Sequence, residues 1–251
     1  MWLHAEREGT GRRLVLVHGF TQTRRCWGPV ADDLARDHEV VRVDAPGHGR
    51  SSEVRAGLRG GGRLIADQGG EATYVGYSMG GRHLLHLALA NPELVRGLVL
   101  LGATAGIDDP VARAERVAAD ERTAARLREV GLLDFLQEWV AQPMFAGVPA
   151  QRQFLVERME STVDGLEASL LQAGAGAQDP SWDRLHRLEM PVLVVAGELD
   201  DKYVRLGRRL RTAIGDNATF ATVVGAGHAA HLEQPEAFLA VLRPWLEAHC
   251  L

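Results

Sequence analysis

Short apolar runs alternate with amphipathic stretches in the first and last parts of the chain. Several runs are hydrophobic at consecutive positions, which is typical of parallel strands covered by helices on both faces. They predict strands over residues 14–17, 39–43, 73–75, 97–101, 192–196 and 219–224. Helical spacing predicts helices over residues 27–36, 79–90, 206–214 and 235–248. This alternation predicts an α/β fold with a mostly parallel central sheet flanked by helices.

Between residues 105 and 188 the pattern changes. This stretch is rich in charge and helical over residues 111–130, 132–140 and 151–171, with prolines and glycines at the breaks. Helices without an intervening strand do not belong to a doubly wound layer. We therefore expect residues 1–104 and 189–251 to form the core and residues 105–188 to form a helical cap, or lid, which would exclude water and shape a substrate pocket. A separate helical domain without a catalytic role is the alternative.

Residues 56–70 should hold the crossover helix between two parallel strands, but six of them are glycine. A glycine inside a helix costs about 1 kcal/mol relative to alanine. The segment therefore predicts only a short helix over residues 63–68. The GxxxxGK[ST] pattern of a phosphate-binding loop is not present in the sequence.

Length and composition narrow the class of protein. The 251 residues are 46% hydrophobic and 24% charged, which is ordinary for a globular domain with a full core. A net charge of -5 gives no electrostatic attraction to nucleic acid or an anionic membrane, so neither is an expected partner. The N-terminus has no apolar signal core, and we expect the cytoplasm. Cys26 and Cys250 are expected to be free thiols, and no spacing of ligands predicts a metal.

The first candidate for chemistry is a Gly-x-Ser-x-Gly motif, Gly76-Tyr77-Ser78-Met79-Gly80. It follows an apolar strand and precedes a helical pattern, which is the setting of a nucleophile elbow. In that turn the serine is held on a sharp strand-to-helix bend, and small flanking residues let the neighbouring backbone approach. The motif alone is a weak signal, but in this setting it predicts Ser78 as the catalytic nucleophile.

A serine hydroxyl needs a base to take its proton and an acid to orient that base. Asp200 follows the strand expected over residues 192–196, and His228 follows the strand expected over residues 219–224. The order serine, aspartate, histidine is that of the α/β-hydrolases. We predict the triad Ser78–His228–Asp200, with Asp201 as the alternative acid and His231 as the weaker alternative base.

Two backbone N–H groups are expected to form an oxyanion hole, each worth about 3 kcal/mol. One belongs to Met79, the residue after the nucleophile. The other belongs to Phe20, in the loop that follows the first predicted strand, and His18 is expected to brace that loop. Residues 44–51 contain a proline and two glycines typical of a tight turn, and we interpret them as a structural loop near the site.

These motifs together resemble the α/β-hydrolase superfamily over nearly the whole chain. The resemblance is carried by the HGF loop, DxPGHGxS, GYSMGGR, GExDxK and GAGHAAHLEQP. Within it, the chain resembles the 2-succinyl-6-hydroxy-2,4-cyclohexadiene-1-carboxylate synthases of menaquinone biosynthesis. The residues that carry this finer resemblance are Arg82, Arg113, Arg116, Asp120, Trp139, Phe145, Arg158, Gln178, Trp182, Lys202 and Tyr203.

The finer resemblance implies elimination of pyruvate from a cyclohexene that carries several carboxylates, with the triad serine as base and without a cofactor. Arginine binds carboxylates in a bidentate fashion, and a residue four positions beyond Ser78 can share its side of a helix. The side chains expected to bind this small carboxylated substrate are Tyr77, Arg82, Arg113, Arg116, Trp139 and Arg158. Solvated positions are the alternative for the arginines of the cap. A carboxylesterase or related acyl hydrolase is the alternative function, because the triad alone suffices for it.

Overall fold

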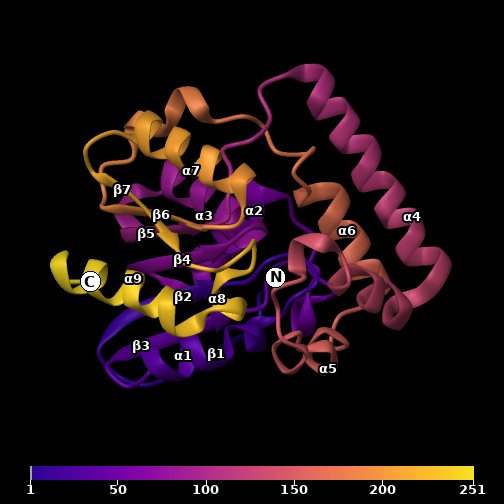
Figure 1. Ribbon diagram of the computed structural model, residues 1–251, viewed down its shortest axis with the longest axis horizontal. Helices are drawn as coiled ribbons and strands as arrows, with labels where there is room; N and C mark the ends of the chain where they lie inside the picture. Colours follow the sequence, from indigo (N-terminus) through magenta and orange to yellow (C-terminus); the bar gives the residue numbers. More distant parts are fainter. Residues whose placement is uncertain (1) are drawn as a thin grey trace.

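A seven-stranded sheet crosses the centre of the computed structural model, which describes residues 2–251 (Figure 1). The strands are β1 (Ala5–Glu8), β2 (Arg12–Val17), β3 (His38–Val43), β4 (Ala72–Tyr77), β5 (Val95–Leu101), β6 (Val192–Gly197) and β7 (Ala218–Val223). Their order is β1-β3-β2-β4-β5-β6-β7, and β1 alone is antiparallel to its neighbour. The mostly parallel sheet predicted from the sequence is confirmed. Strand β1 was not predicted, because its four residues lie at the sheet edge and carry charges at three positions.

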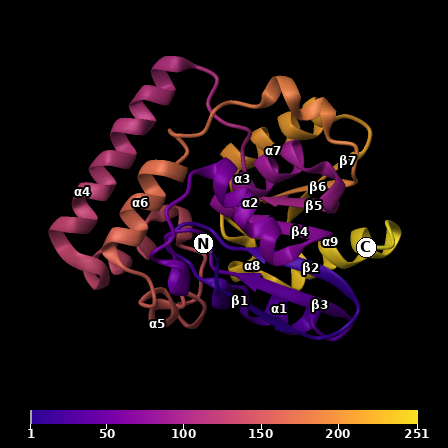
Figure 2. The same cartoon turned by 180° about the vertical axis from the view of Figure 1, so that it is seen from behind.

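Helices cover both faces of the sheet, and the two views in Figures 1 and 2 show them as separate layers. The longer helices of the core are α1 (Gly28–Leu34), α2 (Leu58–Gly69), α3 (Met79–Ala90), α7 (Asp201–Ile214) and α9 (Pro235–Ala248), with the short α8 (Ala230–Glu233) before α9. Short 3-10 helices lie at Arg24–Trp27, Gly49–Ser51, Pro92–Leu94, Pro143–Phe145, Ala150–Arg152 and Trp182–Arg187. Helices α2, α3 and α7 pack on one face, and α1, α8 and α9 on the other.

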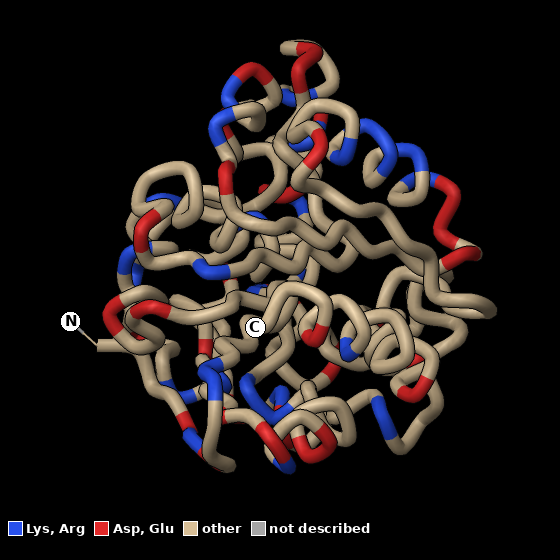
Figure 3. Tube along the Cα trace, turned by 90° about the vertical axis from the view of Figure 1, so that its left-hand side faces the viewer, with Lys and Arg blue, Asp and Glu red and all other residues tan. Residues whose placement is uncertain are grey.

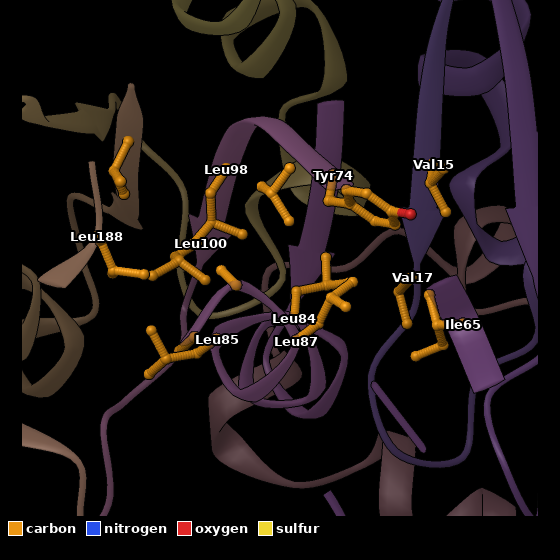
Figure 4. Close-up of a cluster of buried hydrophobic side chains, with 14 of the residues drawn as sticks. Val15, Val17, Ile65, Tyr74, Leu84, Leu85, Leu87, Leu98, Leu100 and Leu188 are labelled. Atoms are coloured by element: carbon orange, nitrogen blue, oxygen red, sulfur yellow. The ribbon is translucent and has the colours of Figure 1, made fainter. Parts of the chain in front are cut away.

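Each central strand sends alternate side chains into two separate cores. Val15 and Val17 of β2 belong to the core beneath α2 and α3, where Figure 4 shows them on the same side as Ile65. Leu14 and Leu16 belong to the core beneath α1 and α9. Burial on both faces explains why these strands are hydrophobic at consecutive positions.

Helix α2 is a correction to the sequence analysis, because it spans twelve residues and includes most of the glycines. A side chain at Gly61 would place its Cβ 2.4 Å from the His83 ring, and one at Gly62 would place it 2.8 Å from the His83 carbonyl oxygen. These glycines therefore let α2 pack tightly against α3. Close packing offsets the intrinsic penalty of roughly 1 kcal/mol for each glycine, a tertiary effect that helix propensity does not contain.

The stretch between β5 and β6 is an inserted helical region. It contains α4 (Pro110–Val140), α5 (Leu155–Arg158) and α6 (Val163–Ala173), and α4 runs beside α6 at one side of the sheet in both views (Figures 1 and 2). The break expected in α4 between residues 130 and 132 is confirmed at Gly131, whose φ is +78°. The helix expected over residues 151–171 is divided instead, because the Thr162 hydroxyl accepts the Gly165 N–H and starts α6 as a separate helix.

Charged residues of both signs are spread over the outer parts of the chain rather than gathered by sign (Figure 3). Cys26 is buried and Cys250 is exposed, and both are free thiols. No helix within residues 2–251 combines the length and the apolar composition that a bilayer span requires.

Candidate active site

Ser78 occupies a strained turn between β4 and α3. Its φ of +51° and ψ of -108° are unusual for a residue with a side chain, and such strain persists only where the surroundings enforce it. The flanking glycines allow this turn. A Cβ at Gly80 would lie 2.2 Å from the Val17 carbonyl oxygen, and one at Gly76 would lie 2.6 Å from the Gly81 backbone nitrogen. The local geometry is that of the nucleophile elbow predicted from the motif.

The ends of three strands bring Ser78, His228 and Asp200 together. His228 Nδ1 lies 2.8 Å from Asp200 Oδ2, and His228 Nε2 lies 3.3 Å from Ser78 Oγ. The other carboxylate oxygen of Asp200 accepts the Tyr203 N–H at 3.2 Å, and so caps the start of α7. An aspartate bound to Nδ1 keeps the proton on that nitrogen and leaves the lone pair of Nε2 facing the serine. The arrangement is able to draw a proton from the hydroxyl.

Neither alternative residue takes part in the arrangement of Ser78, His228 and Asp200. Asp201 is exposed in the first turn of α7, and no hydrogen bond joins it to His228. The His231 ring is buried 4.7 Å from the ring of Trp27 and 4.4 Å from that of Tyr77, centroid to centroid. Both of its nitrogens lack partners among the described residues, and burial lowers its pKa to about 3. His231 is therefore a neutral packing residue.

The two amides expected to form an oxyanion hole are both available. Within residues 2–251, the N–H groups of Phe20 and Met79 have no hydrogen-bond acceptor. The next residue after Phe20, Thr21, has a φ of +66°, which turns the loop sharply. Gly19 lets the loop lie against the elbow, because a Cβ there would be 2.7 Å from the Tyr77 ring.

Two buried histidines brace this loop. His18 donates from Nδ1 to the Gly19 carbonyl at 2.8 Å and accepts the Ala45 N–H at Nε2 at 3.0 Å. His48 accepts the Thr21 N–H at Nε2 at 3.2 Å. Burial lowers the pKa of His18 to about 3 and that of His48 well below its usual range, so both rings stay neutral and keep these acceptor roles. The bracing role expected for His18 agrees with this geometry.

The loop of residues 44–51 is held by a buried ion pair. The Asp44 carboxylate accepts the Arg24 N–H at 2.8 Å, the Arg24 side chain at 2.9 Å and the Arg50 N–H at 3.0 Å. Arg24 also pairs with Glu6 of β1 and with Glu160 of the inserted region. The loop is thus structural, as the sequence suggested, and it ties the inserted region to the sheet.

A cavity of about 490 Å³ lies between the elbow and the inserted region. Its walls are Phe20, Gln22, Tyr77, Ser78, Met79, Arg82, Arg116, Ala119, Asp120, Thr123, Trp139, Gln142, Met144, Phe145, Arg158, Ser169, Leu170, Ala173, Gly174, Asp200, Lys202, Tyr203 and His228. More than half of these residues come from the inserted region, so it encloses the serine. No cluster of three or more His, Cys, Asp or Glu side chains in residues 2–251 is arranged to hold a metal ion.

Two buried arginines line this cavity without a carboxylate partner in the described part of the chain. Arg82 is 7% exposed and donates to the Ala173 carbonyl at 2.7 Å. Arg158 is 5% exposed and donates to the Gln153 carbonyl at 2.7 Å and to the Thr21 hydroxyl. Burial lowers the pKa of Arg82 to about 10 and also lowers the pKa of Arg158. A buried guanidinium with only neutral partners favours an anion beside it.

Three other side chains expected to bind substrate also line the cavity, and one does not. Arg116 is bound to Asp120 at 2.7 Å, which partly neutralises it. Trp139 packs edge-on against Phe20, with 5.0 Å between ring centroids, and the Tyr77 ring lies 5.4 Å from that of His228. Arg113 is half-buried near the start of α4 and is not among the lining residues.

The structure adds residues that the sequence analysis did not single out for the site. The Tyr203 ring lies 4.4 Å from that of His228, and Lys202 beside it lines the cavity. They lie two and three residues after Asp200, the predicted acid, and this proximity in sequence is a usable signal. Gln22 accepts the Gly19 N–H at 3.2 Å and lines the cavity, and no pattern in the sequence marked it.

The buried neutral histidines predict a loss of stability in mild acid. The pKa values of His18, His83 and His231 are about 3 in the folded chain, against about 6.5 when exposed. The stability that these neutral rings contribute is fully present above pH 6.5 and declines as the pH falls toward 3. Between these two pH values, only the unfolded chain binds a proton on each of these histidines. We expect each to lower the free energy of unfolding by up to about 1.4 kcal/mol per pH unit. Urea denaturation between pH 7 and 4 measures the slope.

His231→Phe keeps an aromatic ring between Trp27 and Tyr77. It should make the slope of the free energy of unfolding against pH shallower by an amount equivalent to about one bound proton. The exposed His186→Asn is the matched control and should leave it unchanged. Equal slopes for wild type and His231→Phe would contradict the assignment of a neutral buried ring.

The fold, the elbow and the cavity define a class of protein, an enzyme with the α/β-hydrolase architecture. The profile described as "Alpha/beta hydrolase family" matches residues 14–241. The chain therefore belongs to the α/β-hydrolase family, as the sequence motifs predicted.

Relatives within the family point to a narrower group. The chain is 33% identical to the 2-succinyl-6-hydroxy-2,4-cyclohexadiene-1-carboxylate synthase of Salmonella newport strain SL254, covering 94% of this chain and 95% of that one. It is 29% identical to the putative synthase of the same name in Bacillus subtilis strain 168, covering 93% and 89%. Among solved structures, MenH from S. aureus superposes with a TM-score of 0.89 at 25% identity over 99% of both chains. A thermophilic esterase from Thermogutta terrifontis superposes with a TM-score of 0.81 at 26% identity, over 98% and 93%.

Proposed function

We propose that this enzyme eliminates pyruvate from a succinyl-enolpyruvyl-cyclohexene carboxylate. The product is then a succinyl-hydroxy-cyclohexadiene carboxylate, the compound after which its relatives are named. The observation that carries the proposal is the pair Arg82 and Arg158. They place two buried, uncompensated positive charges in the cavity that contains Ser78. Such charges favour a substrate with several carboxylates over a neutral ester.

The triad supplies the base. In the cyclohexadiene product, the ring carbon that carries the succinyl group is part of a double bond, so a proton α to the succinyl ketone must leave. Ser78 Oγ takes this proton as its own passes to His228 Nε2, and Asp200 stabilises the imidazolium. The released electron pair forms the ring double bond, the existing double bond shifts, and the C–O bond to the enolpyruvyl group breaks. The imidazolium returns a proton to the leaving enolpyruvate, which becomes pyruvate.

The oxyanion hole stabilises the charge that develops in this step. As the proton leaves, the succinyl ketone oxygen gains enolate character. The N–H groups of Phe20 and Met79, which are unpaired in the described chain and belong to residues that line the cavity, are the proposed donors to that oxygen. Donors fixed in advance stabilise such charge by about 3 kcal/mol each. The mechanism needs no acyl-enzyme and no cofactor.

The arginines orient the substrate through its carboxylates. Arg82 and Arg158 are each fixed by a hydrogen bond to a backbone carbonyl, so little freedom is lost when an anion binds. Arg116 is 38% exposed and paired with Asp120, and we assign it a smaller share of the binding. Trp139 and Tyr77 provide flat apolar walls for the ring.

Pyruvate release tests the proposed function directly. Purified protein is mixed with the succinyl-enolpyruvyl precursor, and pyruvate is followed by coupling to lactate dehydrogenase and NADH. Turnover above the spontaneous rate that disappears in Ser78→Ala is the expected result. Release no faster than the buffer blank, from folded protein, would remove the proposal.

A carboxylesterase is the second candidate, because the triad and the two free amides suffice for acyl transfer and an esterase superposes on the chain. Hydrolysis of short p-nitrophenyl esters tests it. Slow cleavage does not separate the two functions, since an open triad attacks activated esters in any case. The ratio of kcat/KM for the two substrates decides: an esterase is indicated if the neutral ester is the better substrate.

A further inference from the structure

A buried carboxylate lies beneath the loop that carries His228. Glu233, at the end of α8, is 6% exposed. Its Oε2 accepts the Gly227 N–H at 2.7 Å, and its Oε1 accepts the Ala229 N–H at 3.0 Å. The two oxygens therefore hold the amides on either side of His228, one each. No lysine, arginine or histidine in the described chain forms an ion pair with this carboxylate, so the two amides are its balancing partners.

The inserted region rests on the same carboxylate. Gly147 lies so close that a Cβ there would be 2.2 Å from Glu233 Oε2. Arg152 donates to the carbonyls of Leu232 and Glu233 at 3.3 and 3.4 Å. Phe145, two residues before Gly147, lines the cavity with its ring centroid 6.3 Å from that of His228. The segment that forms this part of the cavity wall therefore contacts Glu233, which supports the loop of His228, the proposed base.

We propose that Glu233 is a positioning residue, which holds His228 within reach of Ser78 and ties that position to the segment of residues 145–152. The gap between His228 Nε2 and Ser78 Oγ is 3.3 Å, at the long end of a hydrogen bond, so a small shift of the loop breaks the contact. A misplacement of about 1 Å can lower a rate by roughly 100-fold. The inference rests on the triad proposed above, but not on the identity of the substrate.

The test uses a reaction that needs the activated serine but not the proposed substrate. An uncharged 4-nitrophenyl phosphonate diester reacts with an activated serine: a bond forms between Ser78 Oγ and phosphorus, the hydroxyl proton passes to His228, and one 4-nitrophenolate leaves. The amplitude of 4-nitrophenolate release gives the number of folded active sites, and the rate constant of release reports how well His228 is placed. Glu233→Ala should lower the rate constant roughly 10- to 100-fold at unchanged amplitude.

Two further variants separate positioning from general stability. Gly147→Ala keeps the carboxylate but pushes against it from an exposed turn with ordinary backbone, and should slow phosphonylation about tenfold with a smaller fall in Tm than Glu233→Ala. Glu198→Ala is the matched control, because Glu198 accepts the Gly225 N–H of the same loop at 2.9 Å but does not flank His228. It should stay within about twofold of wild type, since surface changes have small effects.

Proton NMR adds a readout that a merely structural role would not move. The Nδ1–H of His228, bonded to Asp200, should give a far-downfield resonance that broadens or shifts in Glu233→Ala and Gly147→Ala and stays in place in Glu198→Ala. If Glu233→Ala does not fold, the rate constant and the resonance of Gly147→Ala decide whether the proposal holds. Wild-type rate constants and resonance in the folded variants would overturn the proposal. Persistent nitrophenolate release from Ser78→Ala would instead refute the triad.

Discussion

Ser78→Ala should abolish pyruvate release almost completely, with a fall in kcat of roughly 10⁴- to 10⁶-fold. Removing the hydroxyl removes the group that takes the substrate proton and passes its own proton to His228 Nε2, which lies 3.3 Å from Ser78 Oγ. Binding should survive, since both buried arginines remain in place. Coupled assays give kcat, and calorimetry with the cyclohexadiene product gives Kd.

A matched serine shows that the loss is specific. Ser181 is also buried, but its hydroxyl bonds to the Ala105 carbonyl away from the cavity. Ser181→Ala should therefore keep kcat within about threefold of wild type. A Ser78→Ala protein that retained more than a small fraction of wild-type turnover would show that another group removes the proton.

Arg82→Met should separate the carboxylated substrate from a neutral one. The guanidinium is buried and bonded only to the Ala173 carbonyl, so its removal deletes a charge that a substrate carboxylate is expected to neutralise. A charge-assisted hydrogen bond of this kind is worth up to about 3 kcal/mol, or roughly 100-fold in kcat/KM for pyruvate release. Hydrolysis of p-nitrophenyl acetate should change by less than about threefold, because that ester carries no charge. Methionine fills similar volume, so the fold should tolerate the change.

Arg113→Met is the matched control for this prediction. Arg113 lies on α4 outside the residues that line the cavity, although the sequence grouped it with the substrate-binding arginines. Both activities should remain at wild-type level in this variant. Equal losses of ester and pyruvate activity in Arg82→Met would mean that Arg82 supports the elbow rather than the substrate.

The sequence predicted the sheet and the three residues of the proposed triad because each depends on a local pattern. An apolar strand followed by glycine and a polar residue recurs at Ser78, Asp200 and His228, and the ends of parallel strands meet at one edge of the sheet. The start of α7 at Asp201, five residues earlier than expected, has a local cause as well, since Asp200 caps the helix. Because aspartate is a favoured N-cap residue, Asp200 indicates the start of α7 once its capping role is considered beside its proposed role as the acid.

The segment of residues 58–69 and the arginines show where local patterns fail. Glycine lowers helix propensity wherever it occurs, yet at Gly61 and Gly62 the absence of a side chain is what lets α2 approach α3. Arg113 and Arg116 share one helix and a spacing of three, and only Arg116 lines the cavity. The rotation of α4 about its axis, relative to the neighbouring segments, decides which of the two arginines faces the cavity. No residue within α4 determines that rotation alone.

By itself the sequence determined the α/β architecture, the elbow and the order of the chemical groups, because hydrophobic periodicity and turn residues act over a few neighbouring positions. The tertiary structure decided which charges face the cavity and what holds the base. Arg82 meets the Ala173 carbonyl across 91 positions, and Gly147 lies against Glu233 although 86 positions separate them. Such contacts depend on how the inserted region packs on the sheet, and packing between distant segments leaves no periodic signal in the chain.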